Sequence, residues 1–253
     1  MTSIDLNSDL GESYGPWHMG DDKSMLNIVT SASIACGGHA SDPNTMTETV
    51  CLAKQKNVVI GAHPGFADKE AFGRRLLPMS AANVESLVAS QVGALIGIAN
   101  LNDAEVKYVK AHGALANWAA ATTEIAQAIV KAVQKSAPHC ALLAISGTEL
   151  EKAGRQLGLK TYSEVFADRA YQSNGQLVPR SIEGSVIHDA KAASDRLVKF
   201  LDSGDMPTLD GNSVKLNADS ICIHGDNPAA VAMGKTIQQQ LISEGFTIAS
   251  FAA

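Results

Sequence analysis

The sequence predicts an α/β fold, a single-domain, seven-stranded irregular (β/α) barrel over residues 1–253. Seven segments have the composition of buried β-strands, and a helix-length segment separates each from the next. Several of these strands are apolar on both faces, which is typical of parallel strands covered by helices. A chain of 253 residues that is 45% hydrophobic also suits one sizeable core. An open, doubly wound sheet is the competing arrangement for the same pattern.

The predicted strands share a feature at their carboxyl ends. They span residues 4–7, 33–36, 58–61, 106–109, 141–145, 160–165 and 220–223. All but the fifth end close to a His or a carboxylate side chain. Because the carboxyl ends of parallel strands lie together and form the ligand-binding edge of such folds, these clusters predict an enzyme site.

Several predicted helices have recognisable starts. Asp42 stands before a proline, Ser80 opens a long helix, and Asp226 or Asn227 precedes another proline. These residues cap helix N-termini, and a proline is favoured at the first helical position. Apolar residues at helical spacing follow each start, so each helix has one face to lay on the sheet.

Two inserts, residues 64–78 and 168–184, are longer than ordinary connections. Connections of this length are usually functional lids or disordered segments. The second insert contains Asn174-Gly175 between Tyr171 and Leu177, which predicts a hairpin turn. Residues 208–216 predict another small hairpin before the last core strand.

Composition excludes several classes of function. The net charge is −6 and the basic residues are scattered, which disfavours nucleic-acid or anionic-membrane partners. The N-terminus lacks the basic and apolar regions of a signal peptide, and the four cysteines show no paired short spacing. We therefore expect a reduced, cytoplasmic protein. No uninterrupted apolar run reaches the roughly 20 residues of a membrane helix.

The first strand carries an acidic group. Asp5, Asn7 and Asp9 alternate onto one face, and Glu12 follows shortly after. Such carboxylates serve as general acid and base, share a proton, or hold a cation through their oxygen atoms. The alternative is that Asp9 and Glu12 only cap loop amides.

Four of the seven histidines stand at equivalent strand-end positions. They are His39, His63, His112 and His224. A lone buried histidine is more often structural, but the shared position predicts that at least two of them belong to the site. A carboxylate with two imidazoles also fits a hydrolytic metal site, although the chain has no His-x-x-x-His pair. A divalent metal therefore stays an open alternative.

Cations stand among these acidic clusters. Lys110 precedes His112, and Arg169 follows Asp168. A cation there is suited to a substrate carboxylate or phosphate, whereas a structural ion pair of Lys110 with Glu164 is the alternative. Three arginines in the two inserts could bind the same groups from a lid: Arg74, Arg75 and Arg180. We expect at least one of them to be solvated at the surface.

Two further motifs are not assigned to chemistry. Cys36, which stands close to His39, is interpreted as a small buried core residue rather than a nucleophile. Gly234-Lys235-Thr236 resembles the end of a phosphate-binding loop but lies within a predicted amphipathic helix and lacks the preceding glycine.

The same segments carry a resemblance to a known family. They are DLNSDLGE (5–12), IACGGHASDP (34–43), GAHPGF (61–66), FGRR (72–75), VKAHGALAN (109–117), EVFADRAY (164–171), LVPR (177–180) and IHGDNP (223–228). With these eight ordered motifs the chain resembles the LamB/YcsF family, which is associated with the ATP-hydrolysing 5-oxoprolinases. The resemblance covers nearly the whole chain.

The resemblance implies a seven-stranded barrel similar to that of the polysaccharide deacetylases. It also implies the A subunit of a 5-oxoprolinase, which works with two further subunits in the ATP-dependent cleavage of 5-oxo-L-proline to L-glutamate. ATP would be a co-substrate, bound here or on a partner chain. A metal-dependent deacetylase or amide hydrolase, and a lactam-binding subunit without catalytic activity, are the alternatives. A homo-oligomer is possible in each case.

The motifs place a set of polar residues on the family's shared positions. We expect Asp9 or Glu12, with His39 or His63, to act as general base and acid, and His112 to belong to the same catalytic group. Substrate binding is assigned to Lys110, Glu164, Asp168, Arg169, His224 and Asp226.

The chain also departs from the usual family pattern. Gly38 and Ala116 replace aromatic residues, and Ala111 replaces a proline. We expect the losses at Gly38 and Ala116 to widen or reshape the pocket.

Overall fold

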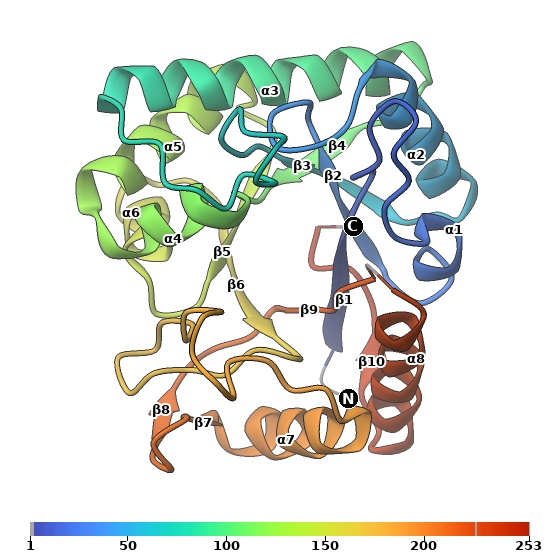
Figure 1. The fold of residues 1–253 in the computed structure, drawn as a ribbon, viewed down its shortest axis with the longest axis vertical. Coiled ribbons are helices and arrows are strands. Elements are labelled where there is room, and N and C mark those ends of the chain that lie inside the picture. Colours follow the sequence, from blue (N-terminus) through green and yellow to red (C-terminus); the bar gives the residue numbers. More distant parts are fainter. Residues whose placement is uncertain (1–2, 226, 253) are drawn as a thin grey trace.

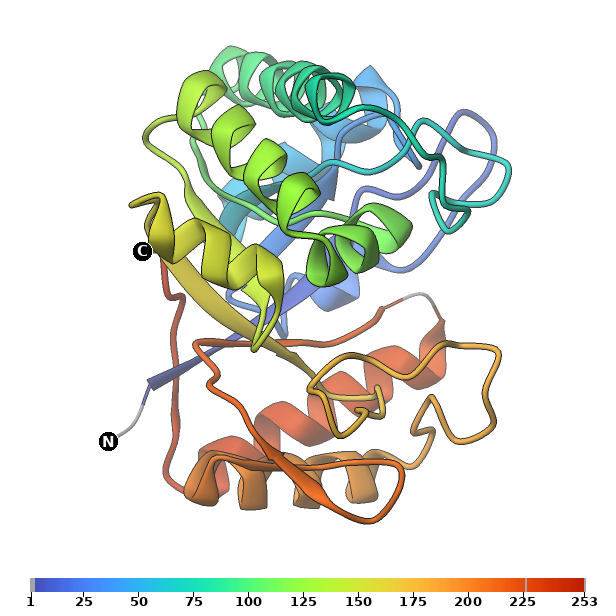
Figure 2. The ribbon, with the colours of Figure 1, turned by 90° about the vertical axis from the view of Figure 1, so that its left-hand side faces the viewer.

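A computed structural model describes residues 3–225 and 227–252. Seven parallel strands pair in the order β1-β2-β3-β4-β5-β6-β9, and β9 pairs back with β1 to close the barrel. Figures 1 and 2 show the helices packed around the outside of this barrel. The predicted irregular (β/α) barrel is confirmed, and the competing open sheet is wrong because both edges of the sheet meet.

The chain alternates strand and helix through most of its length. The strands are β1 (Ser3–Leu10), β2 (Ser31–Ala35), β3 (Val59–His63), β4 (Val106–Val109), β5 (Ala141–Ile145), β6 (Thr161–Phe166), β7 (Asp205–Pro207), β8 (Ser213–Lys215), β9 (Ser220–Cys222) and β10 (Thr247–Ile248). The helices are α1 (Asp22–Met25), α2 (Pro43–Gln55), α3 (Ala81–Leu101), α4 (Gly113–Ala121), α5 (Thr123–Ser136), α6 (Glu149–Gln156), α7 (Ala190–Ser203) and α8 (Pro228–Ser243). All seven predicted barrel strands are present, with boundaries shifted by up to three residues.

Strand β1 illustrates how the barrel divides its side chains. Leu6 and Leu10 belong to the hydrophobic core, which lies between the strands and the surrounding helices. Asn7 and Asp9 alternate with them and make their polar contacts across the barrel interior. The alternation of β1 therefore places its polar residues inside the barrel.

The amino-terminal half of the barrel interior is also polar. The carboxylate of Asp5 accepts hydrogen bonds from the hydroxyls of Thr30, Ser31 and Ser220. Burial raises the pKa of Asp5 to about 6, against the lowering effect of these hydroxyls. Asp5 thus fastens three segments together away from the strand ends, rather than joining the acidic group there.

The ring of Tyr108 fills the space beside Gly61. A β-carbon added at Gly61 would overlap this ring, so only glycine fits there. The Tyr108 hydroxyl lies 3.0 Å from Ser33 Oγ. Gly61 and Tyr108 are aligned on the adjacent strands β3 and β4, next to a register shift.

The predicted helix starts are confirmed where the structure describes them. Asp42 accepts hydrogen bonds from two amides of α2, and Ser80 accepts one from Asn83 in α3. Asn227 caps α8 by accepting from the Ala230 amide. The other proposed cap of this helix, Asp226, lies outside the described residues.

Both predicted hairpins are present. Tyr171 forms an antiparallel bridge with Leu177 around Asn174-Gly175, and β7 pairs antiparallel with β8. Within the first insert, Asp68 and Arg75 form a salt bridge that ties residues 68–75 into a loop. These inserts lie beside the carboxyl ends of the barrel strands, where they surround the cavity described below.

Helix α3 is long and apolar enough, by length and composition alone, to cross a membrane, which was not predicted from the sequence. In the structure it lies along the outside of the barrel (Figure 1) and contacts α5, β3 and β4. Its buried stripe is Val84, Val88, Val92, Leu95 and Ala99. This packing is that of a helix covering a barrel.

Candidate functional site

A cavity of about 430 Å³ opens at the carboxyl ends of the barrel strands. Its walls combine strand-end residues with the start of α4 and with both inserts. The polar lining residues include Asp9, His63, Arg74, Lys110, His112, Glu164, Arg169, Arg180 and His224. The structure therefore brings most of the predicted site residues to one place.

The ammonium of Lys110 lies at the base of this cavity. Its Nζ donates to Asn7 Oδ1 at 2.9 Å and to Asp9 Oδ1 at 2.8 Å, and it lies 2.7 Å from Glu164 Oε1. It also donates a hydrogen bond to Cys222 Sγ at 3.3 Å. The ion pair of Lys110 with Glu164, the alternative expected from the sequence, is therefore present, and the substrate-binding role of Lys110 stays a prediction. Glu164 also accepts a hydrogen bond from Asn7, and its part in substrate binding stays a prediction as well.

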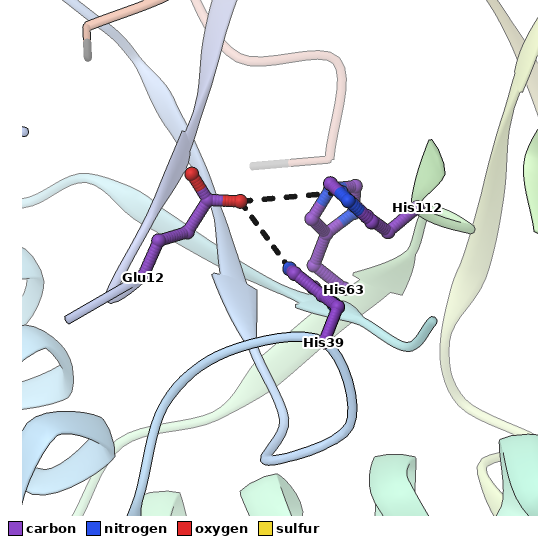
Figure 3. A group of neighbouring side chains, drawn as sticks. All are labelled: Glu12, His39, His63 and His112. Carbon is purple, nitrogen blue, oxygen red and sulfur yellow. Dashed lines mark hydrogen bonds and ion pairs between the residues drawn. The ribbon is translucent and has the colours of Figure 1, made fainter. Parts of the chain in front are cut away.

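Four side chains form a cluster beside Asp9 (Figure 3), here called the His/Glu cluster: Glu12, His39, His63 and His112. One ligand-type atom from each lies within 4.8 Å of all the others. Glu12 Oε1 is 3.2 Å from His39 Nε2 and 3.9 Å from His112 Nδ1. The rings of His39 and His112 are stacked, with centroids 3.6 Å apart.

Backbone carbonyls orient two of these imidazoles. His63 Nδ1 lies 2.7 Å from the Lys110 oxygen, and His112 Nε2 lies 2.9 Å from the Phe72 oxygen. Phe72 has a left-handed backbone with φ of 55°, which is uncommon for a residue other than glycine and is found at functional sites. This role of Phe72 was not predicted from the sequence, although the residue opens the FGRR motif.

Asp9, beside the His/Glu cluster, and Glu12, within it, have opposite electrostatic surroundings. Burial raises the pKa of Asp9, but the charges of His63 and Lys110 outweigh it and hold that pKa well below its usual range. Burial and the charge of Asp9 raise the pKa of Glu12 well above its usual range. These surroundings favour the ionised form of Asp9 and the protonated form of Glu12, a difference of the kind found at acid–base sites.

Burial also keeps two imidazoles of the cluster neutral. It lowers the pKa of His112 to about 3, with a further contribution from His63. It lowers the pKa of His39 well below its usual range, with contributions from His112 and His63. His39 Nδ1 has no hydrogen-bond partner among the described residues.

A second pair faces Asp9 from the other side. His224 Nδ1 lies 2.7 Å from Asp168 Oδ2, and His224 Nε2 lies 3.5 Å from Arg180 Nη2. Ligand-type atoms of Asp9 and His224 also lie within 4.8 Å of each other. Burial raises the pKa of Asp168, but the hydrogen bond from His224 outweighs it, so Asp168 is ionised. Asp168 and His224 thus form a hydrogen-bonded pair close to Asp9.

Arg169 lines the cavity, and its role in substrate binding stays a prediction. Its guanidinium donates to the backbone oxygens of Val178 and Ser185 and is largely buried. It therefore fastens the second insert over the cavity. Asp226, also assigned to substrate binding, lies outside the described residues.

The three arginines of the inserts have two different locations. Arg74 and Arg180 line the cavity, whereas Arg75 is held by Asp68 and Glu70.

Cys36 is buried, and burial raises the pKa of its thiol to about 12. This supports the interpretation of Cys36 as a core residue.

The departures from the family pattern have unequal consequences. Ala111 and Ala116 line the cavity. Gly38 contacts the side-chain amide of Gln91, which bonds both the amide and the carbonyl of Gly65. The widened or reshaped pocket expected from Gly38 and Ala116 stays a prediction, and at Gly38 the side chain of Gln91 occupies the space that a larger residue would need.

The fold and the cavity define a (β/α)-barrel protein with paired acidic and imidazole groups at the carboxyl ends of its strands. The chain belongs to the LamB/YcsF family, whose model matches residues 4–253. A protein from Nitrobacter hamburgensis that is named as the A subunit of 5-oxoprolinase is 45% identical over 250 residues, covering 98% of each chain. One of the same name from Limosilactobacillus fermentum is 45% identical over 248 residues, covering 98% of this chain and 99% of its own.

Solved structures agree with this assignment. The crystal structure of a lactam utilization protein from Thermus thermophilus is 38% identical, with a TM-score of 0.93, and the match covers 99% of this chain and 100% of that one. A family 4 carbohydrate esterase from Streptomyces lividans has a TM-score of 0.50 at 12% identity, over 98% of this chain and 91% of its own. This second likeness concerns the fold alone.

Proposed function

We propose that this chain is the A subunit of an ATP-dependent 5-oxoprolinase, and that its cavity opens the lactam ring of 5-oxo-L-proline to give L-glutamate. The observation that carries the proposal is the full-length similarity, at 42–45% identity, to proteins named as the A subunit of 5-oxoprolinase. The strand-end cavity adds a chemical basis, because it places an ionised carboxylate close to an imidazole pair.

The stability of the lactam explains the need for ATP. Phosphorylation of the lactam oxygen makes the ring carbon electrophilic, and water then adds to that carbon. Cleavage of the carbon–nitrogen bond, with a proton passed to nitrogen, gives an acyl phosphate. A second water hydrolyses this acyl phosphate to L-glutamate and inorganic phosphate.

Asp9 is the group best placed to take a proton from the attacking water. It is ionised, lines the cavity and is held by Lys110 at 2.8 Å. Lys110 fixes the carboxylate in one orientation and compensates its charge, so Lys110 is a positioning residue. A positioned general base contributes on the order of 10²–10⁴-fold to the rate.

His224 is the complementary acid. Its hydrogen bond to Asp168 fixes the orientation of the ring. Its other nitrogen is the one that faces Arg180 at the cavity wall. His224 can therefore deliver a proton to the departing ring nitrogen while Asp9 acts on the water.

The anionic groups of the substrate have a separate set of partners. Arg74 and Arg180 line the cavity from opposite inserts. Helix α4 begins at Gly113, and His112 at its N-cap makes no capping hydrogen bond through its side chain. A helix N-terminus and arginines both favour a carboxylate or a phosphate. We assign the substrate carboxylate and the transferred phosphate to this side of the cavity.

The proposal also includes partner subunits and a location for ATP. We infer that two partner chains supply the phosphorylation step, and that the reaction takes place in the cytoplasm. ATP would then bind on the partners or at the arginine side of this cavity. Equilibrium binding of ATP to the isolated chain distinguishes these two locations.

The test is an assay of 5-oxoproline with and without ATP and with and without the subunits encoded by neighbouring genes. We expect glutamate and ADP in equal amounts, and only when ATP and all subunits are present. Glutamate formed by the isolated chain without ATP would overturn the proposal in favour of a simple amide hydrolase.

Variants separate catalysis from binding in the same assay. Asp9→Asn and His224→Ala should each lower kcat by about 10²-fold or more. His188→Ala, at an exposed position, is the matched control. If both site variants bind 5-oxoproline and turn it over at the wild-type rate, the chain only binds the lactam and the catalytic assignment is wrong.

A further inference from the structure

The hydrogen bonds of His63 and His112 fix where each ring carries its proton. A backbone oxygen only accepts, so the nitrogens that face one, His63 Nδ1 and His112 Nε2, are the protonated ones. In a neutral imidazole the opposite nitrogen then has a lone pair and no proton. Those opposite nitrogens, His63 Nε2 and His112 Nδ1, lie 3.0 Å apart. When both rings are neutral, two lone pairs therefore face each other inside the barrel.

Carboxylate oxygens converge on the same point. Asp9 Oδ2 lies 3.3 Å from His63 Nε2, and Glu12 Oε1 lies 3.9 Å from His112 Nδ1. The ionised carboxylate of Asp9 only accepts hydrogen bonds, and Glu12 would give up its proton when an ion binds. The point between these atoms then has acceptors on several sides, and a buried arrangement of this kind is stabilised by a cation.

The spacing of the acceptors matches a metal better than a shared proton. Metal–ligand distances of about 2.0–2.2 Å separate neighbouring ligand atoms by about 3–3.5 Å around one ion. The separations of 3.0 to 3.9 Å fit this range after small adjustments. A proton shared by the two nitrogens would have Asp9 as its counter-charge, at 3.3 Å from His63 Nε2, but would leave Glu12 and His39 without a role.

The surroundings have the features of a metal centre. Metal-bound histidines usually donate their other N–H to a backbone carbonyl or a carboxylate, as both rings do here. His39, whose Nε2 lies 3.2 Å from Glu12 Oε1, orients that carboxylate and stacks on His112. Glu12 and His112 also line a second cavity of about 270 Å³, which gives an ion a path to the cluster.

We propose that Glu12, His63 and His112 bind one divalent first-row transition metal ion, with Asp9 adjoining it and His39 orienting Glu12. Two imidazoles and a carboxylate form a donor set suited to Zn²⁺ and its neighbours rather than to Mg²⁺ or Ca²⁺. The ion neutralises the charge that accumulates where these acceptors meet. The proposal concerns binding and holds whether or not the substrate is 5-oxoproline.

The experiment is a metal titration of the full-length protein after treatment with a chelator and dialysis. Zn²⁺ is followed by competition with a chromophoric chelator, and Co²⁺ by its visible absorption bands. We expect one equivalent to bind with a Kd of about 1 μM or tighter. Mg²⁺ in tenfold excess should not displace Co²⁺.

Variants locate the ion. His63→Ala and His112→Ala should weaken binding by about 100-fold or more, and His39→Ala by about 10–100-fold as an outer partner. His139→Ala, at an exposed position away from the cavity, is the matched control and should bind as wild type does. Circular dichroism and thermal unfolding of each metal-free variant establish that it is folded.

Two results would overturn the proposal. One is a folded, metal-free wild-type protein that binds neither Zn²⁺ nor Co²⁺ with a Kd below about 100 μM, which would assign the cluster to a shared proton. The other is binding that both His63→Ala and His112→Ala leave unchanged, which would place the ion elsewhere. Because binding is read without substrate, either failure is distinct from a failure of the lactam assay.

Discussion

The ammonium of Lys110 lies 2.7 Å from a carboxylate oxygen of Glu164, although the two residues stand at the ends of strands β4 and β6, which are not adjacent. The same ammonium holds Asp9 on β1 at 2.8 Å. The side chains of Lys110, Asp9 and Glu164 all have little exposure to solvent. One positive charge therefore connects three strands across the barrel interior and sets the position of the proposed base.

Replacing Lys110 with methionine should destabilise the protein by about 3–5 kcal/mol, because removing one partner leaves buried carboxylates without a counter-charge. The free energy of unfolding in urea measures this. Lys107→Met, whose side chain is half-exposed on the same strand, should change it by about 1 kcal/mol or less. The double variant Lys110→Met/Glu164→Gln should recover part of the loss. Equal stabilities of Lys110→Met and Lys107→Met would contradict the ion-pair assignment.

Replacing Gly61 with alanine should destabilise the barrel by about 3 kcal/mol, the upper end of the cost of overpacking, because the added methyl group would overlap the Tyr108 ring. Denaturant unfolding measures the change. Gly93→Ala is the matched control, since the space beside this exposed helical glycine is open and alanine favours a helix there. Adding Tyr108→Leu to Gly61→Ala should restore stability in part. A Gly61→Ala protein as stable as wild type would show that the ring moves freely.

The carboxyl of Asp5 should give stability a pH dependence. Its folded pKa of about 6 exceeds the usual 3.8, so the folded protein binds the proton more tightly than the unfolded chain does. Stability is therefore gained as pH falls from about 6 toward 4, and lost as pH rises through 6. Relative to Asp5→Asn, wild type should gain about 2 kcal/mol between pH 7.5 and pH 4.5.

The measurement is urea unfolding of both proteins at the two pH values, so that titrations common to both cancel. Asp202→Asn, at an exposed position, is the control and should differ from wild type by the same small amount at each pH. If the gap between wild type and Asp5→Asn is constant across this range, the buried carboxyl does not titrate there.

The position of a residue at a strand end was a strong predictor that it belongs to the candidate site. Parallel strands bring their carboxyl ends to one edge, so the rhythm of strand and helix was enough to place Asp9, His63 and His112 together. The barrel follows from the same alternation of strands and helices, because consecutive residues show both the periodicity and the composition of each element. These parts of the fold and site need no knowledge of long-range contacts.

The partners of each side chain were not predictable in the same way. Lys110 and Glu164 are 54 residues apart, and their contact depends on the closure and register of the barrel. Arg169 was assigned to a ligand because its chemistry allows that, and its backbone partners in the second insert depend on how that insert folds. At Gly38 the space depends on Gln91, a residue on a helix that the motif does not contain.

The size of the side chain at position 116 should set which lactams enter the cavity. Ala116 is half-buried in α4 and lines the cavity wall. A tyrosine there would occupy part of the roughly 430 Å³ cavity. One methylene in a binding pocket changes specificity by about 10–200-fold, so Ala116→Tyr should lower kcat/KM for a six-membered lactam acid at least tenfold. The value for 5-oxoproline should stay within about threefold, because the smaller ring needs less of that space.

The assay uses the assembled enzyme with ATP and compares kcat/KM for the five-membered and six-membered lactam acids. Ala82→Tyr, at an exposed position on α3, is the matched control and should alter neither value. Wild-type enzyme should accept both substrates, whereas Ala116→Tyr should separate them. An equal loss for both rings would mean that position 116 supports the fold of α4 rather than bounding the substrate, and an unchanged ratio with full activity would place the lactam on another wall of the cavity.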